Sequence, residues 1–180
     1  RRHEVINMKK RTVIILAATL CVVACAFGIT FCGNFRGSLD PEDYPAMKNF
    51  YYTTAQDSCT ITGVKDRSAT KIYIPDCVTA IGDTAFSGCD SLKQVTISKN
   101  VTSIGKGAFS VCDSLEKIYI EGGNRVFHSR ENCIIKTKTK ELVAGCKSSI
   151  IPDDGSVTSI GEYAFYGCSL PVSLVIPDDI

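Results

Sequence analysis

The chain has 180 residues, 44% hydrophobic and 22% charged, which is enough for one globular or repeat domain plus a short additional segment. Its formal net charge of +1 hides an asymmetry, because residues 1–36 hold six of the 20 Lys and Arg but only one of the 19 acids. Residues 37–180 therefore carry a net charge of −4, and such a mildly acidic body lacks the dense basic surface that nucleic acids attract. We expect no nucleic-acid partner.

A basic and then apolar segment lies near the start of the chain. Met8-Lys9-Lys10-Arg11 precedes residues 13–31, which contain no charged side chain. A positive flank followed by an apolar core is typical of an export signal. We expect no structure in residues 1–7, and a signal peptide or N-terminal membrane anchor over residues 8–36.

Three fates of this apolar segment stay open. Ala24-Cys25-Ala26 has the small-x-small form of a signal-peptidase site, whereas residues 22–25 resemble a lipoprotein signal in which Cys25 is acylated. The apolar run over residues 13–31 comes close to the roughly 20 residues that span a bilayer, which favours an uncleaved anchor over the other two. Each fate places the rest of the chain at the cell surface or makes it secreted, and any membrane contact is expected through the N-terminal segment only.

Residues 37–58 follow as a stretch of mixed polar and aromatic residues that shows no stable period and includes Gly37, Pro41 and Pro45. Such a composition is typical of a spacer. We expect a linker over residues 37–58 and a folded domain over residues 59–180.

The folded part is dominated by internal repetition, because one nine-residue string occurs at residues 81–89, 104–112 and 160–168. The first two copies begin at residues 81 and 104, and the interval between them gives the repeat period. The third copy begins at residue 160, which is later than one further period after residue 104. We therefore expect coils of about 23 residues, interrupted by one irregular coil at about 121–156.

Short alternating apolar runs accompany the repeats, and a period of two predicts strands with one buried face. The runs are Ile72/Ile74, Val95/Ile97, Ile118/Ile120 and Leu174/Ile176. With Leu92 and Leu115 three residues ahead, two of them become Leu-x-x-Val-x-Ile and Leu-x-x-Ile-x-Ile, the strand signature of a leucine-rich repeat. The predicted fold class is an α/β-type repeat solenoid with short parallel strands and short helical or irregular turns.

The Ala-Phe pair and the glycine of each repeated string have structural interpretations. Ala allows the returning turn to approach closely, and Phe fills the interior behind the strands. Gly82, Gly105 and Gly161 are expected to supply turn geometry that a Cβ would hinder.

The string Ile-Pro-Asp-x-Val-Thr-x-Ile-Gly-x-x-Ala-Phe-x-x-Cys at residues 74–89, with its echoes at 101–112 and 157–168, closely resembles the BspA-like leucine-rich repeats of bacterial surface proteins, which also occur in some mucosal protists. Residues 127–135 and 144–146 resemble an interrupting unit of such proteins. The resemblance implies an extracellular or cell-surface protein partner and a role in adhesion to host or neighbouring cells. The alternative is a non-catalytic stalk or spacer of a larger surface protein or enzyme. Because residues 176–180 align with residues 74–78, we also expect the chain to be a C-terminally incomplete piece of a longer protein.

Five of the seven cysteines in residues 59–180 raise the question of disulfide bonds. Cys89, Cys112 and Cys168 share one repeat position, and we expect a ladder of reduced, buried thiols there. The segments around Cys133 and Cys146 are expected to form a hairpin that pairs Thr137 with Leu142 and so places the two cysteines opposite each other. A disulfide between them and two buried thiols are the two alternatives.

No catalytic or metal site is expected. The sequence lacks nucleophile-elbow and phosphate-loop or dinucleotide motifs, and His128 has no ligand pair at metal-binding spacing, so neither a cofactor nor catalysis is predicted. The glycosylation pattern at Asn100 belongs to the repeat signature and is interpreted as chance.

The binding surface is instead predicted from the outward positions between the buried strand residues. These are Lys71, Tyr73, Gln94, Thr96, Lys117 and Tyr119, followed by Ser173 and Val175 in the last run. The two tyrosines offer rigid amphipathic contact area of the kind that is enriched in protein interfaces.

Overall fold

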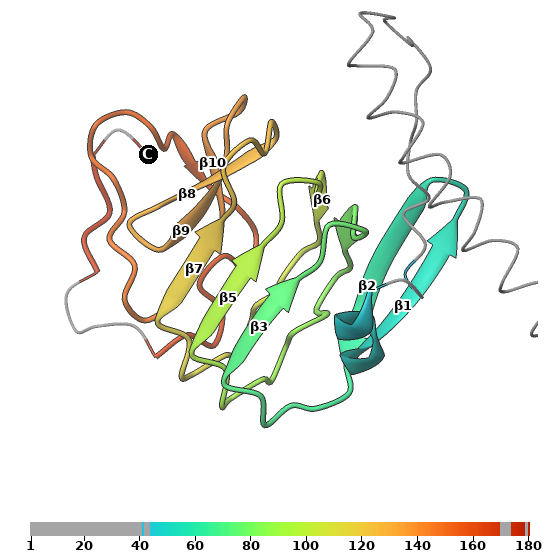
Figure 1. Ribbon diagram of the computed structural model, residues 1–180. Coiled ribbons are helices and arrows are strands. Elements are labelled where there is room, and N and C mark those ends of the chain that lie inside the picture. The colour runs from blue at the N-terminus through green and yellow to red at the C-terminus, as the bar shows by residue number, and fades with distance from the viewer. Residues whose placement is uncertain (1–40, 42–43, 170–173, 179) are drawn as a thin grey trace, which may run out of the picture. The chain divides into compact units, whose positions relative to one another are not determined.

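The computed structural model describes residues 41, 44–169, 174–178 and 180 (Figure 1). The chain divides into two compact units, Arg1–Gly37 and Ser38–Ile180, and all described residues belong to the second. The predictions for residues 1–36, including acylation of Cys25, and the position of Ser173 lie outside the described residues. No helix within the described part of the chain combines the length and the apolar character that crossing a membrane requires.

Three of the predicted strands form a parallel sheet. β3 (Lys71–Ile74), β5 (Gln94–Ile97) and β7 (Lys117–Ile120) lie side by side, each displaced by one repeat period from its neighbour (Figure 1). Their alternating apolar residues are buried, because side chains on a strand point to opposite faces in turn. The predicted strands and repeat length are confirmed for these three coils.

A second row of short strands lies on the return path of each coil. β4 (Ala80–Ile81) pairs with β6 (Ser103–Ile104), again one repeat period further along the chain, and β4 also pairs with β2 (Ser58–Val64). The turns that follow β4 and β6 stack through backbone hydrogen bonds, of which the bond from the Phe86 N–H to the Ala108 carbonyl is 2.8 Å long. Of the two predicted turn types, helical or irregular, the turns are irregular. No α-helix occurs among the described residues, so the label α/β overstates the helical content.

The prediction of a linker over residues 37–58 is wrong for residues 45–58. A 3-10 helix, η2 (Pro45–Asn49), leads into β1 (Phe50–Ala55), which pairs antiparallel with β2. Met47 and Phe50 are buried, and the Phe50 ring contacts the ring of Phe86 edge to face at 6.2 Å. The segment therefore caps the core of the first coil, a role that terminal units of repeat proteins need because their last face is otherwise exposed.

Aromatic rings form the interior behind the strands. Phe86 and Phe109 are both buried and stack with centroids 5.1 Å apart and an interplanar angle of 13°. With Phe50 at one end, three rings continue through the cap and the first two coils. The predicted role of Phe as an interior plug is confirmed for these coils.

The glycines that follow the return strands, Gly82, Gly105 and Gly161, act through close approach and not through a left-handed backbone. The Gly82 N–H donates to the Ile61 carbonyl at 2.8 Å, and a Cβ on Gly82 would stand 3.1 Å from the same oxygen. Left-handed residues lie at later positions of the same strings and include Gly88, with φ of 72°, and Val111, with φ of 53°. The Cβ argument for the glycines is therefore correct.

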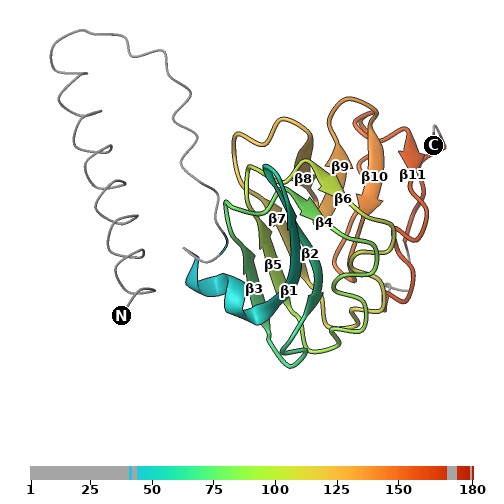
Figure 2. The same ribbon diagram turned by 90° about the vertical axis from the view of Figure 1, so that its right-hand side faces the viewer.

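The irregular coil folds as a pair of antiparallel hairpins. β8 (Phe127–Arg130), β9 (Cys133–Lys136) and β10 (Glu141–Ala144) form a sheet that β11 (Ser159–Ile160) joins in parallel. β4, β6, β10 and β11 are visible together from the side (Figure 2). The predicted hairpin exists, but its register is wrong: Leu142 pairs with Ile135 and a bulge follows, while Cys133 lies opposite Arg130.

The fourth alternating run does not form a strand. Val175 and Ile176 are in irregular structure and exposed, so the predicted strand at Leu174/Ile176 is wrong. The segment β8 lies next to β7 and holds it through a 3.0 Å bond from the Ile120 N–H to the Ser129 hydroxyl. β8 is therefore the neighbour of β7.

Candidate binding surface

All six predicted contact residues within described strands lie on the outer face of the β3-β5-β7 sheet, which we call the strand face. The register aligns them in two rows across the coils, Lys71–Gln94–Lys117 and Tyr73–Thr96–Tyr119. Neighbouring strands in a sheet stand about 4.8 Å apart, so the two tyrosines are about 10 Å from each other. Val175, predicted as a further member, is exposed but does not belong to this sheet.

The tyrosines of the strand face are available for contact. Tyr73 is 47% exposed and Tyr119 is 54% exposed, whereas their neighbours in the strands are buried. Aromatic side chains that expose a large apolar area next to a hydroxyl are enriched in protein interfaces. The strand face thus combines aromatic area with amide, hydroxyl and ammonium groups.

Acidic groups lie at one end of this face. Partial burial of the Tyr73 hydroxyl, followed by the negative charges of Glu121 and Asp76, raises the pKa of Tyr73. The hydroxyl therefore remains protonated at neutral pH, and it interacts with the Glu121 side chain. The alternation rule missed Asp76 and Glu121, because both follow the last residue of a strand and only the stacking of coils brings them to the face.

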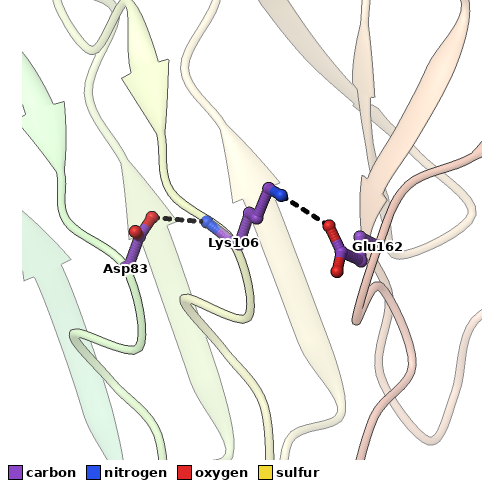
Figure 3. A network of polar contacts seen from close by, with 3 residues as sticks. All are labelled: Asp83, Lys106 and Glu162. Carbon is purple, nitrogen blue, oxygen red and sulfur yellow. Dashed lines mark hydrogen bonds and ion pairs between the residues drawn. The ribbon is translucent and has the colours of Figure 1, made fainter.

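The repeat turns present a second surface, which we call the turn face. An Asp83 carboxylate oxygen accepts the Lys106 backbone N–H at 2.8 Å, and the Lys106 ammonium pairs with Glu162 at 2.6 Å (Figure 3). The three residues come from the three copies of the repeated string, so the network links their turns. Tyr163 and Tyr166 are also exposed here, with rings 5.6 Å apart.

The cysteines of the repeat are free thiols, as expected. Cys89 and Cys112 are buried, and the Cys112 thiol donates to the Phe86 carbonyl of the preceding coil at 3.1 Å. Burial raises the pKa of Cys112 to about 12, and that of Cys168 to about 11. Thiols that stay protonated at neutral pH are poor nucleophiles, so the ladder is structural.

The disulfide between Cys133 and Cys146 is not formed in the structure. Both residues are buried free thiols. The Cys133 thiol contacts the Ile150 carbonyl at 3.6 Å, and the Cys146 thiol contacts the Asn132 carbonyl at 3.9 Å. The bulge between β9 and β10 is the reason that the predicted cross-strand pair does not arise.

Other candidate groups have local structural partners. His128 contacts the Thr137 hydroxyl at 3.0 Å, and the described residues contain no cluster of three or more His, Cys, Asp or Glu that could hold a metal ion. The Asn100 side-chain amide donates to the Asp76 carbonyl at 2.8 Å, so its nitrogen contributes to coil stacking.

Parallel strands paired in register one repeat period apart, a Leu-x-x-Ile-x-Ile interior and stacked returning turns define a leucine-rich repeat protein. The family model of the BspA type leucine rich repeat region (6 copies) matches residues 64–142 and 141–180. The chain belongs to this family, and the resemblance seen in the sequence is confirmed. No curated protein sequence matches it significantly.

Solved structures of leucine-rich repeat proteins are similar to this chain. The leucine rich repeat protein of T. pallidum shares 26% identity and a TM-score of 0.50, over 68% of this chain and 66% of that one. A leucine rich cell surface protein from Faecalibacterium prausnitzii shares 26% identity and a TM-score of 0.46, over 68% of this chain and 33% of that one. A leucine-rich repeat protein from Bacteroides ovatus shares 23% identity and a TM-score of 0.47, over 73% of this chain and 35% of that one. The chain thus spans less than two thirds of the length of each of these proteins.

Proposed function

We propose that the coils form a solenoid that binds an extracellular or cell-surface protein through the strand face, and that the chain acts as an adhesion module at the cell surface. One observation carries this proposal: three adjacent strands hold Tyr73, Thr96 and Tyr119 in one outward row, and both tyrosines are about half exposed. Extended surfaces of this kind are the binding faces of repeat proteins. Membership of the BspA type family supports the same function.

A comparison of the turn face with the strand face favours the strand face as the contact surface. On the turn face, the carboxylates of Asp83 and Glu162 are both engaged with Lys106. On the strand face, Lys71, Lys117 and Tyr119 form no ion pair or ring contact within the described part of the chain. Their contact capacity is thus available to a partner. The proposal assigns no catalytic step to these residues.

Localisation belongs to the same proposal. The basic and apolar N-terminal segment supports export, and retention as an anchor would keep the binding face close to the producing cell. The chain belongs to the BspA type family, and its repeats resemble those of bacterial surface proteins. Both points support this location.

The test is binding of the purified protein to a panel of immobilised extracellular matrix proteins, measured by biolayer interferometry. We expect saturable binding, and we expect Tyr73→Ala with Tyr119→Ala to weaken it roughly tenfold or more, because aromatic residues at interface centres carry much of the affinity. The matched control is Tyr163→Ala with Tyr166→Ala, which removes two exposed tyrosines from the turn face. Equal loss in both variants contradicts the strand face as the site, and a folded protein that binds nothing on the panel favours the stalk or spacer role.

A further inference from the structure

A row of lysines lies at the beginning of the three strands of the strand face. Lys71 and Lys117 are the first residues of β3 and β7, and Lys93 directly precedes β5. All three side chains are exposed. Only Lys71 and Lys117 follow from the alternation of the strands, because Lys93 lies one position outside it.

Backbone hydrogen bonds connect this level of the structure through four successive coils. The Lys93 N–H donates to the Thr70 carbonyl at 2.8 Å, and the Glu116 N–H donates to the Lys93 carbonyl at 3.0 Å. The irregular coil continues the series with a 3.2 Å bond from the Lys147 N–H to the Leu115 carbonyl. Lys147 thus joins Lys71, Lys93 and Lys117 in what we call the lysine row.

The lysine row carries an excess of positive charge. Glu116 lies among the lysines, and its carboxylate pairs with Lys147 at 2.9 Å. The hydrogen bond from Lys147, and then the charges of Lys147, Lys93 and Lys117, lower the pKa of Glu116. These three lysines therefore act on one carboxylate. Lys71, Lys93 and Lys117 form no ion pair with any described residue. The four lysines and Glu116 together have a net charge of +3, whereas residues 37–180 as a whole carry −4.

We propose that the lysine row binds an acidic, extended segment of the partner protein, which lies across β3, β5 and β7. The proposal rests on the proposed function and names the chemistry of its partner. Neighbouring strands of the sheet stand about 4.8 Å apart, with Lys93 offset by one position along its strand from Lys71 and Lys117, and alternate side chains of an extended peptide project on one side about 7 Å apart. Long lysine side chains bridge that difference. Gln94 is in register between Lys71 and Lys117, and Thr96 lies on the same face two residues further along β5. They provide amide and hydroxyl groups for the peptide backbone of such a segment.

The experiment uses a fluorescein-labelled peptide of about ten glutamates as the probe and measures its fluorescence anisotropy with the purified protein. We expect binding at about 50 mM salt that weakens severalfold at about 200 mM, because screening shortens the reach of exposed charges. Lys71→Glu with Lys117→Glu should weaken binding roughly tenfold or more, since like charges then face the peptide. Lys138→Glu with Lys140→Glu makes the same change in net charge at two other exposed positions and should alter binding less than about twofold.

Three results would overturn the proposal. They are no binding of the glutamate peptide by the unmodified protein, equal losses in the two lysine variants, and binding of a sulfated heparin oligosaccharide in its place. Failure of this proposal is distinguishable from failure of the proposed function. If the peptide does not bind but panel binding still depends on Tyr73 and Tyr119, the acidic partner is wrong and the strand face stands. If peptide binding depends on the lysines while the tyrosine variant binds the panel normally, the tyrosine row is wrong.

Discussion

The first two coils and the irregular coil keep the same backbone ladder but fill their interiors in different ways. The glycine that follows the return strand donates at 2.8 Å to the preceding coil in all three copies, at Ile61, Ile81 and Leu142. A later bond of the ladder runs from the Phe86 N–H to the Ala108 carbonyl in the regular coils and from the Gly145 N–H to the Ala164 carbonyl in the irregular one. Gly145 therefore stands where a regular coil has a phenylalanine.

The glycine at this position explains how the third repeated string stacks on the irregular coil. The ring of Phe165 lies where a side chain of residue 145 would be, since a Cβ there would overlap it. The turn of the third copy also meets the second copy directly, through a 2.9 Å bond from the Val111 N–H to the Tyr166 carbonyl. The comparison shows that the backbone hydrogen bonds set the spacing of the coils. The interior of a coil is filled either by its own phenylalanine, such as Phe86, or by the Phe165 ring of the next coil.

The largest effect is expected from removing the central ring of the regular coils. Phe86→Ala deletes a buried ring that contacts both Phe109 and Phe50, and should lower the free energy of unfolding by about 3–5 kcal/mol. Urea unfolding followed by circular dichroism measures it. Tyr73→Ala, at an exposed position of the same sheet system, is the control and should change stability by less than about 0.5 kcal/mol. Similar losses in both variants would mean that the aromatic stack does not hold the regular coils together.

The irregular coil should respond to the opposite change. Gly145→Ala forces a Cβ against the Phe165 ring and should cost about 1–3 kcal/mol, the range for overfilling a packed interior. Gly122, which has open space around its Cβ position, gives the control Gly122→Ala. In a double-mutant cycle, the cost of Gly145→Ala should shrink when Phe165 is also alanine. If Gly145→Ala costs as much in the Phe165→Ala background, the Phe165 ring does not fill the space beside residue 145.

The thiol ladder adds a pH dependence to the regular coils. The folded-state pKa of Cys112 is raised by burial from 9.0 to about 12, so its contribution to stability is fully present below pH 9 and is lost as pH rises from 9 towards 12. Between pH 8 and pH 10 the free energy of unfolding of the unmodified protein should fall by about 1.4 kcal/mol more than that of Cys112→Ala. Chemical unfolding of both proteins at the two pH values measures the difference. Parallel pH profiles would show that Cys112 is not held protonated by the fold.

The smallest effect sharpens the comparison at the contact between the second and third copies. Val111 adopts a left-handed backbone, with φ of 53°, at the position that Gly88 and Gly167 occupy in the other two turns. Val111→Gly should raise the free energy of unfolding by about 0.5–1 kcal/mol, because a β-branched residue is strained there. Thermal unfolding detects this as a higher Tm. A lower Tm would mean that the packing of the Val111 side chain on Gly167 outweighs the backbone strain.

The regular coils could be predicted from sequence because their information is local. Strict alternation at residues 72–74, 95–97 and 118–120, at constant spacing, defines both the strands and the residues that face outward. The cap escaped prediction because, within η2 and β1, only Met47 and Phe50 are buried, too few to produce a period. The hairpin register depends on the pairing of β9 with β10 and on its bulge, which are non-local. Lys93, Asp76 and Glu121 were missed for a similar reason, since stacking and not strand alternation brings them to the strand face.

The exposed tyrosines on the two faces allow a direct test of the central claim that the strand face binds the partner. Tyr73 and Tyr119 lie on that face, whereas Tyr163 and Tyr166, 51% and 62% exposed, lie on the turn face. Hydroxyl-radical footprinting with mass spectrometry, in the presence and absence of a bound panel protein, reports the oxidation of all four in one sample. The account predicts that the partner protects Tyr73 and Tyr119 and leaves Tyr163 and Tyr166 unchanged. Protection of Tyr163 and Tyr166 with full oxidation of Tyr73 and Tyr119 would contradict it.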